Sequence, residues 1–295
     1  MSKRIPVMGL DLTSNQRQNS FKKYKFFACD VRNKKRLQEL FQQERITHVI
    51  HLAYLMDPQH DMRYEYDVDV NGSKSVFEAA HETKTVKQFI HFSSASAYGA
   101  FPDNSLWITE ERPLRPRDWV YAQNKKIVEE YYNNFKKNFK LINLRMCTAV
   151  GPSYDKKGGV VNILAKSPIG LLLDGKDTAV QFIHEEDIKN IIDLIIKDKK
   201  IEGTFNLASD SYATTKELNS KKWFIPLPKW LFKSIISLLW HLRITTASPT
   251  SVNLVAHSII VSPKKLMERY NYRFLYSTNS AYEHAVKERE KNGTL

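Results

Sequence analysis

Cysteine is scarce in this sequence, and no apolar run is long. The 295 residues contain two cysteines, Cys29 and Cys147, and each lies inside an apolar segment. This usage argues against a disulfide framework and indicates buried thiols in a reducing compartment, so a cytoplasmic protein is expected. The most hydrophobic segment, residues 230–242, is interrupted by Lys233 and is shorter than the roughly 20 residues that span a bilayer. No membrane span is therefore expected, and residues 230–242 are predicted to form a packed helix rather than a helix on a membrane surface.

Acidic residues are also in the minority. The sequence has 45 lysines and arginines against 32 aspartates and glutamates, which gives a formal net charge of +13. A charge of this sign attracts anions, including nucleic acids and nucleotide cofactors. The lysines occur singly and in pairs and form no stripe, which favours a generally solvated basic surface. Nucleic acid is therefore not an expected partner, although charge alone keeps it as an alternative, and no metal site is predicted.

Strand-like and helix-like segments alternate along the first half of the chain. Near-continuous apolar stretches, typical of buried strands, occur at 4–11, 24–31, 47–54, 88–94 and 140–146, and helical periodicity occurs at 33–44, 61–83 and 119–137. Strands that alternate with helices predict an α/β fold in which helices cover both faces of a parallel sheet.

The pattern changes after residue 152, where glycine and proline break the chain into shorter pieces. Residues 179–209 contain one more strand–helix–strand pattern, which we expect to return to the sheet. The predicted organisation is therefore an α/β domain over residues 1–152, joined by residues 179–209, and a smaller lobe within residues 153–295.

A tyrosine and a lysine lie one helical turn apart in the segment 119–137. Tyr121 and Lys125 share a line with Val128 and Tyr132, the face expected to pack on the core. Burying an ammonium costs several kcal/mol unless something pairs with it. A tyrosine with its usual pKa near 10 is no base at neutral pH, but a nearby ammonium favours the phenolate. The spacing therefore suggests that Lys125 tunes Tyr121; the alternative is a core tyrosine beside a lysine that extends to solvent.

A serine ends the strand expected at 88–94. Ser94 would stand at the carboxyl end of a parallel strand, where open α/β sheets bind ligands. Its hydroxyl could donate a hydrogen bond to a substrate oxygen that becomes a carbonyl. A simple cap of the following turn is the alternative.

The ordered set of segments SSASAYG, YAQNK, LRMCTAVGP and FIHEEDI resembles the extended short-chain dehydrogenase/reductase family, in its NAD-dependent epimerase/dehydratase branch. CDV, HLA, VNGSKSVFEAA and GTFNLAS also fall in the family's order, so the resemblance covers nearly the whole chain. It implies a Rossmann-like doubly wound parallel sheet, NAD as the cofactor, and a smaller C-terminal lobe that binds the substrate.

The resemblance also implies roles for individual residues. Tyr121 would be the catalytic acid/base, Lys125 would tune it and hold the nicotinamide ribose, and Ser94 would orient the substrate. The other residues implied are Asp11 at the adenosine ribose, Asp30 and Val31 beside the adenine, Ala53 beside the cofactor, and His184 near the substrate. The charge of Asp11 would repel a 2′-phosphate and so favours NAD over NADP. For His184, a core histidine with satisfied hydrogen bonds is the alternative.

The chain departs from the family in its glycines. Family members begin with a strand, a G-x-x-G-x-x-G turn and a helix, and those glycines let the backbone approach the pyrophosphate. Here Gly9 is the only glycine before Gly72. We therefore expect a truncated start at the family's second strand, with a gap in the middle of the sheet. Such a chain should be marginally stable and should bind NAD weakly.

Two further departures concern polar residues. The family has asparagine where this chain has Asp69, and a carboxylate near cofactor phosphates would be repulsive, although Asn71 could substitute. The family's dehydratases carry an Asp-Glu pair after the serine, whereas this chain has Ala95 and Ser96, which disfavours dehydration.

The expected function is an NAD-dependent epimerase or dehydrogenase that acts on a nucleotide-linked sugar by tyrosine-assisted hydride transfer. Reduction of another carbonyl substrate stays open, because the C-terminal lobe sets the pocket. The alternative from another class is a non-catalytic Rossmann-like relic or binding module. The missing glycine turn and Asp69 favour this alternative, whereas Ser94, Tyr121 and Lys125 oppose it. A homodimer is a further expectation from the resemblance.

Overall fold

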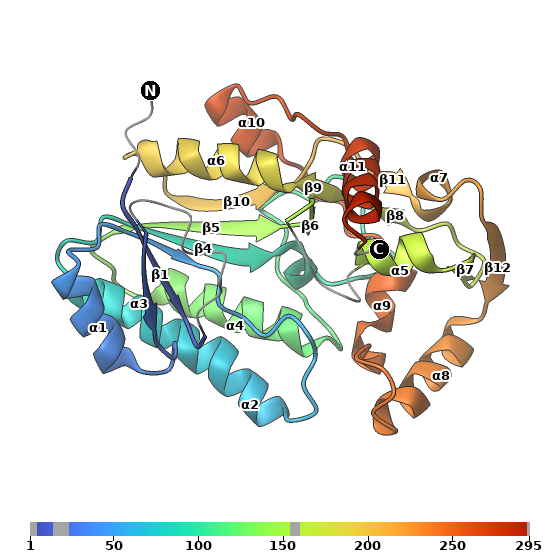
Figure 1. Ribbon diagram of the computed structural model, residues 1–295, viewed down its shortest axis with the longest axis horizontal. Coiled ribbons are helices and arrows are strands. Elements are labelled where there is room, and N and C mark those ends of the chain that lie inside the picture. Colours follow the sequence, from blue (N-terminus) through green and yellow to red (C-terminus); the bar gives the residue numbers. More distant parts are fainter. Residues whose placement is uncertain (1–4, 14–23, 154–159, 294–295) are drawn as a thin grey trace.

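A parallel sheet of four strands lies at the centre of the molecule (Figure 1). The computed structural model describes residues 5–13, 24–153 and 160–293, so Arg4, where the first strand was expected to begin, lies outside them. The strand order is β10-β5-β4-β3. The four strands are β3 (His48–His51), β4 (Gln88–Ser94), β5 (Lys140–Met146) and β10 (Gly203–Leu207).

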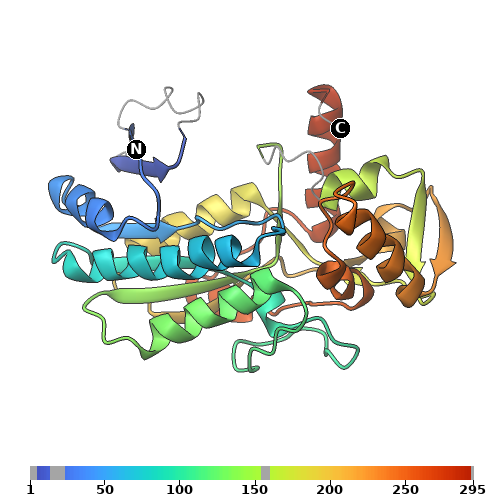
Figure 2. The same cartoon turned by 90° about the horizontal axis from the view of Figure 1, so that it is seen from below.

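Helices cover both faces of this sheet (Figures 1 and 2). One face carries α1 (Lys34–Gln43), α3 (Gly72–Glu82) and α4 (Val120–Asn134), and the other carries α6 (Glu185–Lys197) and α10 (Lys264–Tyr270). Successive strand residues point to opposite faces, so Phe89 packs with the first layer and Ile90 with the second. The predicted Rossmann-like, doubly wound α/β fold is confirmed.

The first two strands form a separate parallel pair. β1 (Val7–Asp11) and β2 (Tyr24–Ala28) bond to each other but to no strand of the central sheet. In Figure 1, β1 crosses β4 and β5 at a steep angle. The expected gap is therefore present: in the described part of the chain β3 is an edge strand, and its Ile50 is 39% exposed. Edge strands with exposed apolar residues favour association with other chains.

The helix expected at 61–83 has three parts. It begins as α2 (Met62–Tyr66), continues through a π-helical turn at Asp67–Asn71, and ends as α3. A π turn inserts one residue into the helical repeat and often marks a functional site. Here it places the buried Asp69 on the inward side.

Two strands end earlier than the sequence indicated. β2 ends at Ala28 because the Asp30 carboxylate accepts the backbone N–H of Arg32 and turns the chain. β3 ends at His51, after which the chain leaves the sheet as a loop.

The C-terminal part contains three two-stranded sheets and several short helices. The strand pairs are β6 (Thr148–Val150) with β9 (Phe182–His184), β7 (Ile169–Leu173) with β12 (Trp223–Leu227), and β8 (Ala179–Val180) with β11 (Ala213–Thr214). The helices are α5 (Val160–Lys166), α7 (Thr215–Leu218), α8 (Lys229–His241), α9 (Val252–Ala256) and α11 (Thr278–Lys291).

The prediction of a packed helix at 230–242 is wrong in one respect. α8 forms there, and Phe232 and Ile236 pack against Leu173, but none of its residues is buried. α8 packs on α9 and, through Trp240, on His60, and the rest of its surface stays exposed. No helix among the described residues is long and apolar enough to cross a membrane.

Candidate active site

The inward face of α4 carries an unusual row of polar side chains. Tyr121, Lys125, Glu129 and Tyr132 follow one another at intervals of one turn, and the last three are buried. Lys125 is only 2% exposed, so it does not extend to solvent. The alternative of a solvent-directed lysine is therefore wrong.

A carbonyl oxygen and two aromatic rings compensate the buried ammonium of Lys125. Its Nζ donates a hydrogen bond of 2.6 Å to the carbonyl oxygen of Phe92. It also lies 3.2 Å from the ring centroid of Tyr54 and 5.4 Å from that of Tyr121. Cation–π contacts of this kind are strongest where water is excluded. The Lys125 ammonium thus lies on the same side of α4 as Tyr121.

Tyr121 is held between two aromatic side chains. Its ring stacks on Trp119 at 4.6 Å between centroids and meets the edge of Tyr54 at 5.8 Å. Tyr54 was missed in the sequence, although it follows Ala53 directly. Burial raises the pKa of Tyr54 well above 10, so this phenol stays protonated and does not compete as a base.

Ser94 ends β4 two residues after Phe92, the residue bonded to Lys125. The hydrogen bond to Phe92 therefore ties the helix of Tyr121 to the strand of Ser94. The Ser94 hydroxyl accepts the N–H of Ser96 at 3.2 Å and lies 2.8 Å from the Ser96 hydroxyl. It caps the short helix Ala95–Tyr98, so the capping alternative describes what this hydroxyl does within the chain.

Asp69 faces the interior. Its carboxylate accepts the N–H of Leu55 at 2.9 Å and the side-chain amide of Asn124 at 3.3 Å. Burial raises the pKa of Asp69 to about 6, and the charge of Lys125 opposes this rise. Asn71 is exposed and bonds to Asp67, so the expectation that it substitutes at position 69 is wrong.

The buried charge of Lys125 predicts an unusual dependence of stability on pH. Burial lowers the pKa of Lys125 to about 7, against the attraction of Asp69 and Glu129. Between this value and the ordinary pKa near 10.4, the unfolded chain binds more protons than the folded one, so stability rises with pH. We expect the free energy of unfolding, measured with urea, to rise by about 2 kcal/mol from pH 7 to pH 9.

Lys125→Met should abolish this rise, whereas the neighbouring Lys126→Met should preserve it, because Lys126 is partly exposed and pairs with Glu130. The same rise in both variants would show that another group is responsible.

Two buried histidines lie close to this cluster. His51 and His91 stack with ring centroids 6.1 Å apart, and His51 also lies 6.2 Å from Tyr54. His51 Nε2 is 2.8 Å from the Ser73 hydroxyl, and His91 Nδ1 is 3.1 Å from the Asn143 side-chain oxygen. Burial lowers the pKa of His51 to about 3 and also lowers that of His91, so both rings are neutral beside the ammonium.

A buried ion pair fixes α4 on the sheet. Glu129 accepts hydrogen bonds from the guanidinium of Arg145 on β5 and, at 2.8 Å, from the hydroxyl of Ser93 on β4. Arg145 also donates to the Tyr98 hydroxyl at 2.9 Å. Glu129 was missed in the sequence, although it lies one turn after Lys125 on the same side of α4. The pair positions the helix that carries Tyr121.

The residues expected at the adenosine end of the cofactor lie on the separate strand pair. Asp11 ends β1, and its carboxylate accepts the N–H of Leu12. The Asp30 carboxylate accepts three hydrogen bonds from the Arg32 guanidinium, which lowers the pKa of Asp30. Val31 packs closely against Gly72 at the start of α3.

His184 is engaged within the chain at both ring nitrogens. Its Nδ1 accepts the N–H of Glu186 and caps α6, and its Nε2 lies 2.9 Å from Nδ1 of His284. The ring of Tyr276 stacks on it at 3.8 Å. This arrangement favours the core-histidine alternative over the expected contact with substrate.

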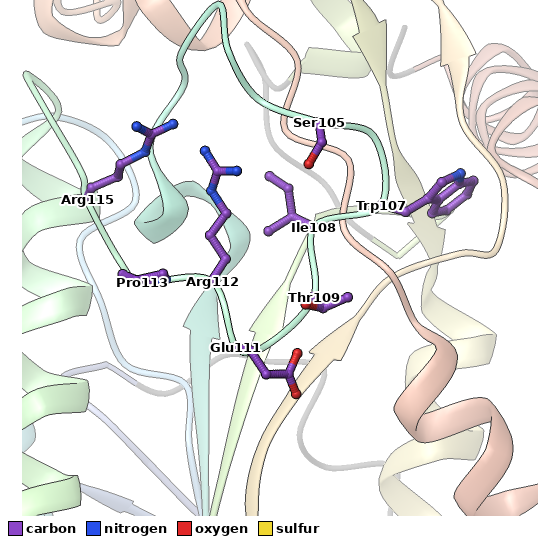
Figure 3. Close-up of a pocket in the computed structure, with 8 residues that line it drawn as sticks. All are labelled: Ser105, Trp107, Ile108, Thr109, Glu111, Arg112, Pro113 and Arg115. Carbon is purple, nitrogen blue, oxygen red and sulfur yellow. The ribbon is translucent and has the colours of Figure 1, made fainter.

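A pocket of about 630 Å³ opens in the loop between β4 and α4 (Figure 3). Its lining includes neither Ser94 nor Tyr121 nor Lys125; it is formed by Ser105, Trp107, Ile108, Thr109, Glu111, Arg112, Pro113 and Arg115. The Arg115 guanidinium pairs with Asp103 at 2.9 Å. Ile108 bridges to Val261, so the pocket rests on the C-terminal part of the chain.

The doubly wound sheet and the Tyr-x-x-x-Lys helix packed on its central strand place the protein among the Rossmann-like α/β proteins. Residues 1–208 match the NAD dependent epimerase/dehydratase family, and the chain belongs to this family.

Curated relatives match only parts of their own length. A dTDP-D-glucose 4,6-dehydratase of Dictyostelium discoideum is 25% identical over 211 residues, which cover 63% of this chain and 46% of that protein. UDP-glucose 4-epimerase 2 of Oryza sativa subsp. japonica is 34% identical over 135 residues, 43% of this chain and 31% of that protein. The chain therefore matches less than half the length of these relatives.

Solved structures match over nearly all of the chain. The Bordetella bronchiseptica enzyme WbmG in complex with NAD has a TM-score of 0.76 at 17% identity and covers 97% of this chain and 86% of its own. The UDP-glucose 4-epimerase of Thermotoga maritima with UDP-glucose has a TM-score of 0.76 at 18% identity, with 97% and 91% covered. At such identities the similarity concerns the fold.

Proposed function

We propose that this protein binds NAD and acts in the cytoplasm as an epimerase or dehydrogenase of a nucleotide-linked sugar. The observation that carries the proposal is the Lys125 ammonium, which is buried beside Tyr121 and bonded to the strand that ends in Ser94. Burying a charged group lowers the stability of the fold unless the group is compensated, so a buried lysine beside Tyr121 favours a functional role for its charge. Relatives named as UDP-glucose 4-epimerases add support for the substrate class.

The residues fit the nicotinamide half of NAD better than its pyrophosphate. Lys125 has donors left beyond its bond to Phe92, and Tyr121 lies within its field. No glycine-rich turn occurs in the sequence to receive the phosphates. We propose that Asp11 binds the adenosine ribose and that Ala53 lies beside the cofactor. Asp30 and Val31 are those proposed beside the adenine.

In the proposed mechanism, Tyr121 removes the proton from a sugar hydroxyl while the Lys125 charge stabilises the phenolate. The Ser94 hydroxyl turns from Ser96 to hold the same sugar oxygen. NAD supplies the hydride acceptor. Ala95 and Ser96 offer no acid for a departing hydroxyl, so dehydration is not part of the proposal.

A non-catalytic binding module is the second candidate, and the unpaired edge of β3 favours it. Conversion of UDP-glucose by the full chain with added NAD, followed by NMR, separates the two. Turnover that is lost in Tyr121→Phe supports the enzyme; NAD binding without turnover of any nucleotide sugar supports the module. A homodimer and a different carbonyl substrate remain further proposals.

A further inference from the structure

The lobe that contains α8 and β12 carries an apolar surface with no acidic residue near it in sequence. Residues 218–267 contain seven lysines and arginines and no aspartate or glutamate. All 32 aspartates and glutamates of the chain lie outside this segment. One carboxylate from outside the segment, that of Asp174, accepts the N–H of Lys229 at the start of α8. The segment is otherwise basic, and a positive surface is complementary to anions.

The exposed apolar side chains of α8 lie on one side of the helix. Trp230 is 70% exposed, Leu238 61% and Leu242 59%. Leu238 lies two turns after Trp230, and Leu242 lies one turn after Leu238. Phe232 and Ile236, on the opposite side, pack into the lobe. α8 therefore carries apolar side chains on its outward side as well as on its inward side, and those on the outward side are exposed.

The strand before α8 repeats this pattern. Trp223 pairs with Ile169, and Ile225 with Leu171, so these four side chains share one face of the β7–β12 sheet. Trp223 is 84% exposed and Ile225 47%. Both elements lie at the end of the molecule away from α1 (Figures 1 and 2).

Basic side chains accompany these apolar residues. Lys221, Lys233 and Arg243 are exposed, and none of them is in an ion pair with the part of the chain that the structure describes. Lysine and arginine beside exposed tryptophan and leucine are typical of helices that lie in a membrane interface and bind anionic headgroups. At 13 residues α8 is too short to span a bilayer, so it would lie along the surface.

We propose that Trp230 and Leu238 of α8, with Leu242 directly after the helix and Trp223 of β12, dock this protein on a membrane surface that carries anionic lipids. The apolar side chains insert between headgroups, and Lys221, Lys233 and Arg243 contact the lipid phosphates. The association is peripheral and reversible, because it rests on one short helix and a few charges. It does not depend on the proposed enzymatic function.

The test is sedimentation of the full chain with vesicles of phosphatidylcholine, with and without phosphatidylglycerol, at low and high salt. We expect binding to the anionic vesicles that weakens with salt. Leu238→Glu should weaken it by about ten- to a hundredfold, since one leucine no longer leaves water. Leu275→Glu is the matched control, because Leu275 is 60% exposed but lies outside this lobe surface, and it should bind as the unmodified protein does.

Three results would overturn the proposal. One is the absence of binding to anionic vesicles. Another is equal binding by both variants, which would trace the binding to net charge alone. The third is a dimer in light scattering that Leu238→Glu dissociates while vesicles bind nothing, which would identify a second copy as the partner. Circular dichroism of both variants confirms that they are folded.

Discussion

Replacing Glu129 by glutamine should lower the free energy of unfolding by about 3–5 kcal/mol. The substitution keeps the shape of the side chain but leaves the Arg145 guanidinium buried without a counter-charge. It also weakens the hydrogen bond from Ser93. Since a domain of this kind is stable by about 5–15 kcal/mol, the loss should be visible as a large shift of the urea midpoint.

Glu130→Gln is the control for this experiment. Glu130 is the next residue of α4, is mostly exposed, and pairs with Lys126 at 3.6 Å. An exposed pair contributes about 0–1 kcal/mol, so this variant should unfold close to the unmodified protein. A double replacement, Glu129→Met with Arg145→Met, should be less destabilised than Glu129→Gln, because no lone charge remains. Equal midpoints for Glu129→Gln and Glu130→Gln would contradict the anchoring role of the pair.

Replacing Tyr121 by phenylalanine should lower NAD-dependent turnover by about 10²- to 10⁴-fold. The change removes one hydroxyl and keeps the ring that stacks on Trp119 and meets Tyr54. Fold and NAD affinity should therefore stay nearly unchanged while the proton transfer is lost. The measurement is the initial rate with UDP-glucose and NAD, together with the melting temperature of each variant.

Tyr131→Phe removes a hydroxyl from the same helix without touching the site. The Tyr131 hydroxyl donates to Glu78 at 2.8 Å on α3. We expect this variant to retain turnover. It would then show that the loss of a tyrosine hydroxyl from α4 does not by itself lower the rate. Turnover by Tyr121→Phe at the level of Tyr131→Phe would remove Tyr121 from the role of acid/base.

Sequence patterns predicted the elements of the sheet because its strands are apolar throughout and its helices keep one apolar face. They also predicted the gap next to β3, since the absence of a glycine turn can be counted. They did not predict that β1 and β2 form a separate pair that crosses the central sheet steeply, because that orientation depends on how Met8 and Leu10 pack on the helical layer.

The candidate site was predictable in its spacing but not in its contacts. A spacing of four positions places Tyr121 and Lys125 on one side of a helix, and the structure brings them together with the strand of Ser94. The compensation of Lys125 by Tyr54 comes from a loop that the sequence does not relate to α4. The pairing of His184, at the end of β9, with His284 of α11 is likewise a tertiary contact between elements far apart in the sequence.

α8 shows the limit of hydrophobicity as a guide to burial. Its sequence is apolar enough for a core helix, yet the described residues that pack against it, among them Leu173, α9 and His60, cover only part of its surface. Burial depends on the partners available as much as on the side chains themselves.

NAD titration, followed by saturation-transfer NMR, tests most directly whether Lys125 belongs to the cofactor site. The three proteins to titrate are the unmodified chain, Lys125→Met and Lys126→Met. We expect a dissociation constant near the millimolar range, about −4 kcal/mol, for the unmodified chain. Lys126→Met should bind equally, and Lys125→Met should bind at least about tenfold more weakly, because a charge-assisted hydrogen bond is lost. NAD binding that is the same with methionine at position 125 would contradict the assignment of this buried lysine to the cofactor site.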